Sequence, residues 1–322
     1  MLAYPCDKVT GMSDTEGDLT PVQKSVLDAL AKEPGFVALP ADVIESARSQ
    51  LHGLVADIAE QLEPDKALWV SKNKVTTVHG CEGHYLANLG NFEWTVANVR
   101  GTVVHKAIEL ATNWKGEFTP SDVVDEALDR VAADERISAA NFVDSLSDSD
   151  RAELRSGAID LYTKFEECFP PLKAAWRPVL ESGARYEMFD KRIIMSTKTD
   201  LTLGASGNKV IIDVKTGSLH PHHREELRFY ALVEALRTGL APRKLATLSL
   251  LTARIDVEDV TEGVLQAATR KTADAIRKMY ELEREKREPK LVPSATCRWC
   301  PLAETCSTGR DYLEREAEAD DY

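Results

Sequence analysis

The stretch Ile193–Thr216, with the sequence IIMSTKTDLTLGASGNKVIIDVKT, gives the clearest indication of the fold. Two runs of branched and apolar residues flank Gly-Ala-Ser-Gly-Asn, a group of turn-forming residues, so a β-hairpin is predicted. With residues 205–208 as its loop, Asp200 lies directly across from Asp213. Facing carboxylates repel each other, so this pairing favours a cation held between the two strands.

The second strand of the hairpin is predicted to have one charged and one apolar face. Side chains alternate along a strand, so Asp213 and Lys215 share a face, while Val210, Ile212 and Val214 form the opposite face and belong to the core. Two carboxylates can hold one or two Mg²⁺ or Mn²⁺ ions, and a neighbouring lysine can orient or help deprotonate a water that attacks a phosphodiester. A D-x-K pattern alone also occurs on exposed strands, so other parts of the chain must support this interpretation.

Three cysteines near the C-terminus have the spacing C-x2-C-x5-C, which brings their thiolates close enough to bind one metal centre. A remote cysteine would supply the fourth ligand. Cys81 is the best candidate, because Cys168 lies in a predicted helical segment and Cys6 lies near the N-terminus. The alternatives are a structural zinc site completed by a histidine, and reduced thiols without a metal. The three clustered cysteines are Cys297, Cys300 and Cys306, and the histidines that could complete a zinc site are His79 and His84.

Composition and charge limit the possible functions. The chain has 322 residues, of which 43% are hydrophobic, and its net charge is −13, which argues against binding nucleic acid through bulk charge. Residues 184–254 are an exception, with 12 Lys and Arg against 7 acidic residues, so a local DNA site is expected there. Neither a membrane span nor a secretory signal is visible, so a cytoplasmic protein without a membrane partner is expected.

Periodicity and turn residues predict alternating helices and strands. Residues 120–176 are helical and poor in strands, so they are predicted to form a helical insertion. Helices are expected at 21–32, 41–63, 102–114, 224–237 and 263–287, and strands at 186–189, 193–203, 209–214 and 245–255.

Several motifs occur in a characteristic order: Gly101-Thr-Val-Val-His105, Asp200, Asp213-Val-Lys215, and the late cysteine cluster with one early cysteine. In this respect the chain resembles the PD-(D/E)XK nucleases of the RecB-like branch over Leu68–Cys306. That branch includes the RecB and AddB nuclease domains and CRISPR-adaptation exonucleases with an iron–sulfur cluster. The resemblance implies an α/β fold with a restriction-endonuclease-like core, in which helices flank a central mixed β-sheet. A helical insertion and a C-terminal iron–sulfur clip are added to this core.

The expected organisation follows from the same resemblance. Residues 1–66 would form a disordered segment and a helical extension, and 67–310 the nuclease domain, with the insertion at about 118–180 and the cysteine cluster at 297–306. Residues 311–322 would form an acidic tail.

The resemblance also implies roles for individual residues. Asp200, Asp213 and Lys215 would be catalytic, and Mg²⁺ or Mn²⁺ would be bound by His105, Asp200, Asp213 and the backbone carbonyl of Val214. A [4Fe-4S] cluster, with zinc as the alternative, would tie the two ends of the domain together. Its ligands would be Cys81, Cys297, Cys300 and Cys306.

The chain departs from the family pattern at one position. The family usually carries a Gln and a Tyr four residues apart after the D-x-K strand, and here Glu226 and Tyr230 occupy those places. Glu109 and Glu187 are further candidates for supporting the site. Arg224 and Arg228, one helical turn apart, are candidates for contacts with DNA phosphates.

The expected function is a metal-dependent DNA nuclease. It would be an exonuclease that acts on DNA ends or single strands in recombination, repair, or phage and CRISPR DNA processing. The chain has no G-x-x-x-x-G-K-[ST] motif, so unwinding would require a helicase or recombination partner. One alternative is a non-catalytic iron–sulfur module of the same fold that binds DNA or a partner. The other is a zinc-stabilised scaffold in which the D-x-K pattern is accidental.

Overall fold

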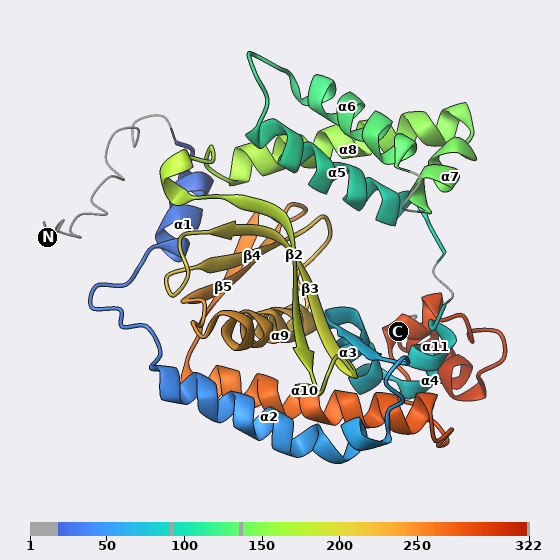
Figure 1. The fold of residues 1–322 in the computed structure, drawn as a ribbon. Coiled ribbons are helices and arrows are strands. Elements are labelled where there is room, and N and C mark those ends of the chain that lie inside the picture. The colour runs from blue at the N-terminus through green and yellow to red at the C-terminus, as the bar shows by residue number, and fades with distance from the viewer. Residues whose placement is uncertain (1–18, 91–92, 135–137, 321–322) are drawn as a thin grey trace, which may run out of the picture.

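A mixed six-stranded β-sheet lies at the centre of the computed structural model, which describes residues 19–90, 93–134 and 138–320 (Figure 1). The strand order is β1-β3-β4-β5-β6, and β2 pairs with β3 along its other edge. The strands are β1 (Leu68–Ser71), β2 (Val179–Met188), β3 (Ile193–Leu203), β4 (Val210–Lys215), β5 (Lys244–Ser249) and β6 (Arg254–Asp259).

Helices cover both faces of the sheet (Figure 1). The core on one face includes residues of α2, α3, α9 and α10, and the core on the other face includes residues of α1, α5, α6 and α8. The helices are α1 (Pro21–Leu30), α2 (Ala41–Gln61), α3 (Lys72–Gly80), α4 (Glu82–Ala87), α5 (Val96–Thr112), α6 (Pro120–Ala133), α7 (Ala139–Asp144), α8 (Asp148–Cys168), α9 (Pro221–Thr238), α10 (Glu262–Glu283) and α11 (Ser307–Asp320).

Strand β4 is buried on both faces. Val210, Ile212 and Val214 belong to the core beneath α5 and α8, as the alternating pattern predicted, and Ile211 belongs to the core beneath α9 and α10. The predicted charged face is therefore also covered, and Asp213 is only 2% exposed. A carboxylate in such a place requires positive partners, because an unpaired buried charge is costly.

Some predicted elements differ in the structure. The single strand expected at 245–255 is instead a hairpin, β5 and β6, whose turn includes Ala253 at φ 53°. The turn contains neither Gly nor Pro, so no turn-forming residue marks its position. Helix α5 begins at Val96, capped by Thr95, six residues before the start predicted at 102, so Gly101 lies inside the helix.

The predicted domain boundaries can be placed on these elements. Helices α6, α7 and α8 occupy most of the expected insertion at about 118–180, but its last two residues already belong to β2. Most of the expected acidic tail belongs to helix α11. The segment 1–18, predicted to be disordered, lies outside the described residues together with Cys6. None of the helices in the described residues is long and apolar enough to cross a membrane.

Candidate active site

The site forms at a gap along one edge of β3. The opposite edge of β3 pairs with β2 over most of its length, whereas the edge with the gap is shared by β1 and β4. Parallel pairing with β1 ends at Ser196, and antiparallel pairing with β4 begins at Leu201, so no strand among the described residues pairs with 197–200 on this edge. The chain directions bring the C-terminal ends of both β1 and β4 to this gap. Side chains at these ends therefore converge on Asp200.

The predicted hairpin register is correct. Leu201 pairs with Ile212, and Leu203 pairs with Val210, so the ladder runs directly toward Asp200 and Asp213. The two aspartates themselves are not a ladder pair. Instead, Oδ2 of Asp200 accepts a hydrogen bond of 2.7 Å from the backbone N–H of Val214.

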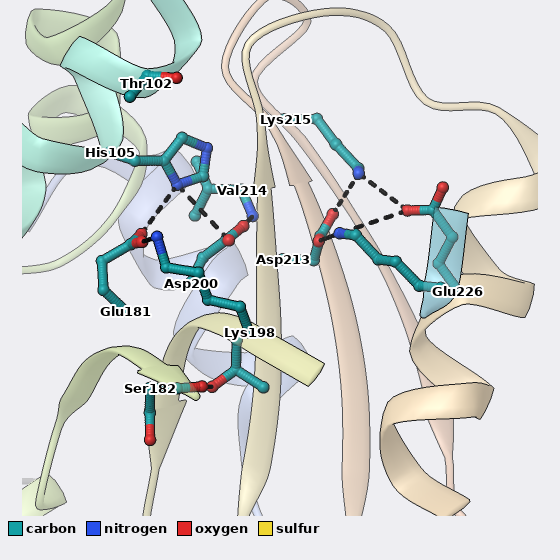
Figure 2. Close-up of polar contacts among 12 residues, drawn as sticks. Thr102, His105, Glu181, Ser182, Lys198, Asp200, Asp213, Val214, Lys215 and Glu226 are labelled. Carbon is teal, nitrogen blue, oxygen red and sulfur yellow. Dashed lines mark hydrogen bonds and ion pairs between the residues drawn. The ribbon is translucent and has the colours of Figure 1, made fainter. Parts of the chain in front are cut away.

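Three potential metal ligands meet at the gap (Figure 2). Nδ1 of His105 on α5 lies 3.4 Å from Oε1 of Glu181 and 3.6 Å from Oδ1 of Asp200. One ligand atom from each of the three residues lies within 4.8 Å of the other two. Lys198 contacts the remaining Glu181 oxygen at 2.5 Å. Two of the predicted ligands, His105 and Asp200, are thus brought together.

Glu181 is the member of this group that sequence reasoning missed. It lies on β2 between Leu180 and Ser182, which pair with Leu201 and Thr199, so it lies beside Asp200 on the neighbouring strand. Its φ of 48° is left-handed, a conformation that costs a non-glycine residue about 1–3 kcal/mol and is often found at functional sites. The strand was predicted only for 186–189. Had it been extended backwards in the same register, it would have included Glu181.

Asp213 belongs to a second charged group beside the first (Figure 2). Lys72 Nζ lies 2.8 Å from its Oδ1, and Lys215 Nζ lies 2.9 Å from its Oδ2. Glu226 on α9 contacts both ammonium groups, at 3.5 Å from Lys72 and 3.0 Å from Lys215. Two carboxylates therefore face two ammonium groups, and their formal charges balance.

The electrostatics of these two groups are strongly shifted. Burial alone would lower the pKa of His105, but the charges of Asp200 and Glu181 outweigh it and raise this pKa to about 9. Burial, and then the charge of Asp213, raise the pKa of Asp200. Burial would also raise the pKa of Asp213, but Lys72 and Lys215 outweigh it and hold this pKa low. Without a metal, the His105 imidazolium is the positive charge between two carboxylates.

A divalent cation fits this arrangement. The imidazole and carboxylate groups are ligands that Mn²⁺ accepts, and carboxylates also suit Mg²⁺. Oδ2 of Asp213 is buried and accepts no well-oriented hydrogen bond, although Lys215 is close to it. A cavity of about 1020 Å³ opens over the three ligands and is lined by His105, Glu181 and Asp200 together with residues of α5 and α6. Solvent and a ligand can therefore reach the group.

The other predicted site residues have varied surroundings. The hydroxyl of Tyr230 donates to the backbone carbonyl of Lys198 at 2.7 Å, so it satisfies the sheet edge in the gap. Glu109 lines the same cavity and is paired with Lys106 at 2.6 Å. Glu187 lies farther along β2, 3.7 Å from Lys191. The arginines are paired with acids of β6, Arg224 with Asp256 at 2.7 Å and Arg228 with Glu258 at 2.8 Å.

Four cysteines line a separate cavity of about 610 Å³, between the α3–α4 junction and the C-terminal segment. Burial, and to a lesser extent neighbouring thiolates, raise the pKa of Cys300. The backbone N–H of Val292 donates to Cys81 Sγ at 3.5 Å, and that of Ser294 donates to Cys297 Sγ at 3.4 Å. The four are Cys81, Cys297, Cys300 and Cys306; Cys168 is buried at the end of α8 and is not among the residues that line this cavity.

The two histidines of the zinc alternative also line this cavity. His79 contacts the Lys271 carbonyl at 3.0 Å through Nε2, and the ring of His84 contacts Asn88. All four cysteines are described by the structure, and no three of their sulfur atoms lie within 4.8 Å of one another. Four thiolates on one zinc, at about 2.3 Å each, would have sulfur atoms about 3.8 Å apart.

Comparison with known proteins identifies the family. The family model of the PD-(D/E)XK nuclease superfamily matches residues 70–307, well over half of the chain. The chain therefore belongs to the PD-(D/E)XK nuclease superfamily, and this membership supports nuclease activity on nucleic acid. No curated protein sequence matches the chain significantly.

Two solved structures show limited similarity. The crystal structure of a "Putative exonuclease" from Eubacterium rectale matches with a TM-score of 0.47 and 13% identity, over 86% of this chain and 94% of the other. The crystal structure of SSO0001 matches with a TM-score of 0.30 and 16% identity, over 67% of this chain and 98% of the other. Both similarities are too weak to support an argument about function.

Proposed function

We propose that the protein is a metal-dependent DNA exonuclease. It would hydrolyse phosphodiester bonds at DNA ends or in single strands during recombination, repair, or phage and CRISPR DNA processing. The observation that carries this proposal is the convergence of His105, Glu181 and Asp200 within 4.8 Å, beside the buried pair of Asp213 and Lys215. Membership of the PD-(D/E)XK superfamily supports the same conclusion.

The cation would be Mg²⁺ or Mn²⁺, held by His105, Glu181 and Asp200 with Asp213 and the Val214 carbonyl. When bound, it supplies Lewis-acid chemistry, since it neutralises charge on the phosphate and promotes deprotonation of the attacking water. The imidazole of His105 would have to release its proton to become a ligand. Glu181 and Asp200, which now lie beside the protonated imidazole, would then bind the cation.

Lys215 would be the catalytic lysine. Asp213 and Glu226 hold its ammonium group at 2.9 and 3.0 Å, so its position is fixed before substrate arrives. From there it would orient the attacking water and stabilise the charge that develops on the phosphate. Asp213 would act both on the cation and on Lys215, which explains why a carboxylate is buried there.

The cysteine site would hold a [4Fe-4S] cluster that joins the C-terminal segment to the α3–α4 junction. One observation favours an iron–sulfur cluster over a single zinc ion. No three of the four sulfur atoms lie within 4.8 Å of one another, whereas thiolates on one zinc would be about 3.8 Å apart. Such a cluster would be structural, because it would tie the C-terminal segment to the α3–α4 junction and none of its cysteines belongs to the group formed by His105, Glu181 and Asp200.

We place the protein in the cytoplasm, where reduced cysteines persist. Its partner would be DNA, together with a helicase or recombination protein that supplies unwinding. A non-catalytic module that binds DNA or a partner is the remaining alternative. The intact set of Asp200, Asp213 and Lys215 favours catalysis over this alternative.

The proposal is tested with linear single- and double-stranded DNA labelled at either end, and with circular single-stranded DNA. The protein is purified anaerobically and incubated with Mg²⁺, Mn²⁺ or EDTA, beside Asp213→Ala and the remote control Glu187→Ala. Metal-dependent shortening of linear DNA by the parent and the control, but not by Asp213→Ala, is expected. Cleavage of circular DNA would replace the exonuclease with an endonuclease, and binding without any cleavage would favour the non-catalytic module.

A further inference from the structure

Lys72 is a second lysine of the site, and the D-x-K pattern does not include it. It follows β1 directly and begins α3, so the chain leaves the sheet at the gap on β3. Its ammonium group reaches Asp213 at 2.8 Å and lies 5.1 Å from the ring centre of Tyr230. The side chain is only 19% exposed, so this ammonium group has little access to water.

Both oxygens of Asp213, a proposed cation ligand, lie beside an ammonium group. Asp213 has two oxygens, and Lys72 contacts Oδ1 while Lys215 contacts Oδ2. A lysine side chain is protonated at neutral pH, so a metal that approaches Asp213 meets the Lys72 ammonium group at 2.8 Å from Oδ1.

Glu226 offers Lys72 another partner. Its Oε2 lies 3.5 Å from Lys72 Nζ, so a small movement of the ammonium group would exchange one carboxylate for the other. Glu226 occupies the place where a Gln was expected, and a neutral amide could not balance the displaced charge. The unexpected carboxylate and the additional lysine thus form a matched pair.

We propose that Lys72 is a positioning residue that holds Asp213 in the metal-free protein and transfers to Glu226 when a divalent cation binds. This inference rests on the proposed function, because it assumes that Asp213 takes part in cation binding. Lys72 then competes with the cation and lowers its affinity. In the metal-free protein, the same contact neutralises a carboxylate that would otherwise repel Asp200.

The test is Mn²⁺ binding to the full chain, measured by isothermal titration calorimetry. Four proteins form a double-mutant cycle: the parent, Lys72→Met, Glu226→Gln and the combined variant. We expect Lys72→Met to bind Mn²⁺ at least about fivefold more tightly and Glu226→Gln to bind it several-fold more weakly. In the combined variant, the effect of Glu226→Gln should disappear, because no ammonium group remains to be relocated.

Lys106→Met is the matched control. It removes a positive charge from the wall of the same cavity, but its partner is Glu109 and not a proposed ligand. We expect its Mn²⁺ affinity to stay within about twofold of the parent, which separates competition at Asp213 from a general change in charge. In EDTA, Lys72→Met should melt below the parent, and Mn²⁺ should raise its melting temperature by more.

Two results would overturn this inference. Unchanged or weaker Mn²⁺ binding by Lys72→Met would show that the lysine does not compete. An equal effect of Glu226→Gln with and without Lys72 would show that Glu226 acts only through its charge. In either case a parent that binds Mn²⁺ and cleaves DNA leaves the proposed function intact, whereas a parent that does neither removes both.

Discussion

The carboxylate of Asp200 accepts the backbone N–H of Val214 at 2.7 Å, directly beyond the last ladder pair of the hairpin. This bond fixes the position of Asp200 relative to the adjacent Asp213. One oxygen of Asp200 supports the strand, and the other faces His105 at 3.6 Å. A single side chain thus joins the frame of the sheet to the proposed cation site.

These two roles of Asp200 can be separated by substitution. Asn retains an acceptor for the Val214 N–H, so Asp200→Asn should unfold with a free energy within about 1 kcal/mol of the parent and yet lose Mn²⁺ binding. Asp200→Ala leaves a buried N–H without a partner and should cost about 1–3 kcal/mol. Urea denaturation in EDTA and Mn²⁺ titration measure the two effects. Equal stability of the Asn and Ala variants would show that the bond to Val214 contributes little.

The role of Lys215 can be tested independently of the fold. Lys72 still neutralises Asp213 in Lys215→Ala, so this variant should keep its fold and its Mn²⁺ binding. Its single-turnover rate of DNA cleavage should fall by about 10²–10³, the usual loss when a group that stabilises developing charge is removed. Lys191→Ala, an exposed lysine away from the site, is the control. Loss of the native circular dichroism spectrum in Lys215→Ala would instead make this lysine structural.

The cysteine site should contribute to stability. Cys300→Ser should reduce the bound iron and lower the melting temperature, because an incomplete cluster no longer ties the C-terminal segment to Cys81. Cys168→Ala, at the end of α8, should leave the iron content unchanged. Iron and zinc analysis of anaerobically purified protein, with calorimetry, gives both quantities. A Cys300→Ser protein as stable as the parent would show that the cysteine site does not stabilise the fold, and stoichiometric zinc would establish the zinc alternative.

His223 gives the protein a predictable pH dependence. Its Nδ1 accepts the backbone N–H of His220 at 3.1 Å, and burial, followed by the charges of Lys215 and His222, lowers its pKa to about 4. Between pH 6.5 and 4 the unfolded chain therefore binds a proton that the folded chain does not, and stability falls as the pH falls through this range.

The substitution His223→Gln retains an acceptor for the His220 N–H but cannot take up this proton. The difference in unfolding free energy between the parent and the variant should therefore shift in favour of the variant as the pH is lowered from 6.5 to 4. Urea denaturation at several pH values measures it. A difference that does not change with pH would show that His223 titrates equally in both states.

The sequence predicted what depends on local signals. The hairpin register followed from the turn residues and the alternating pattern, and it placed Asp200 and Asp213 on neighbouring strands. The register depends on a short stretch, in which turn chemistry and periodicity are informative. His105 as a site residue is predicted only by the resemblance that the whole series of motifs carries.

What the sequence did not predict depends on contacts between distant parts of the chain. Glu181 enters the site because β2 begins at Val179, nine residues before Met188, and keeps its register with β3. Lys72 reaches Asp213 because β1 ends at the gap, and no local signal reports where a strand stops beside another. The arginine partners Asp256 and Glu258 likewise lie on β6, a strand that was not separated from β5 in the prediction.

The most direct test of the account is the Mn²⁺ dependence of DNA cleavage by Glu181→Gln. Gln retains the size of Glu181 but weakens a cation ligand, so the half-saturating Mn²⁺ concentration should rise at least about tenfold, because changes to residues that only support a ligand already cost about 10–100-fold in metal affinity. Glu187→Gln, on the same strand, should match the parent. Equal half-saturation by Glu181→Gln and the parent, or cleavage that persists in EDTA, would contradict a cation site at His105, Glu181 and Asp200.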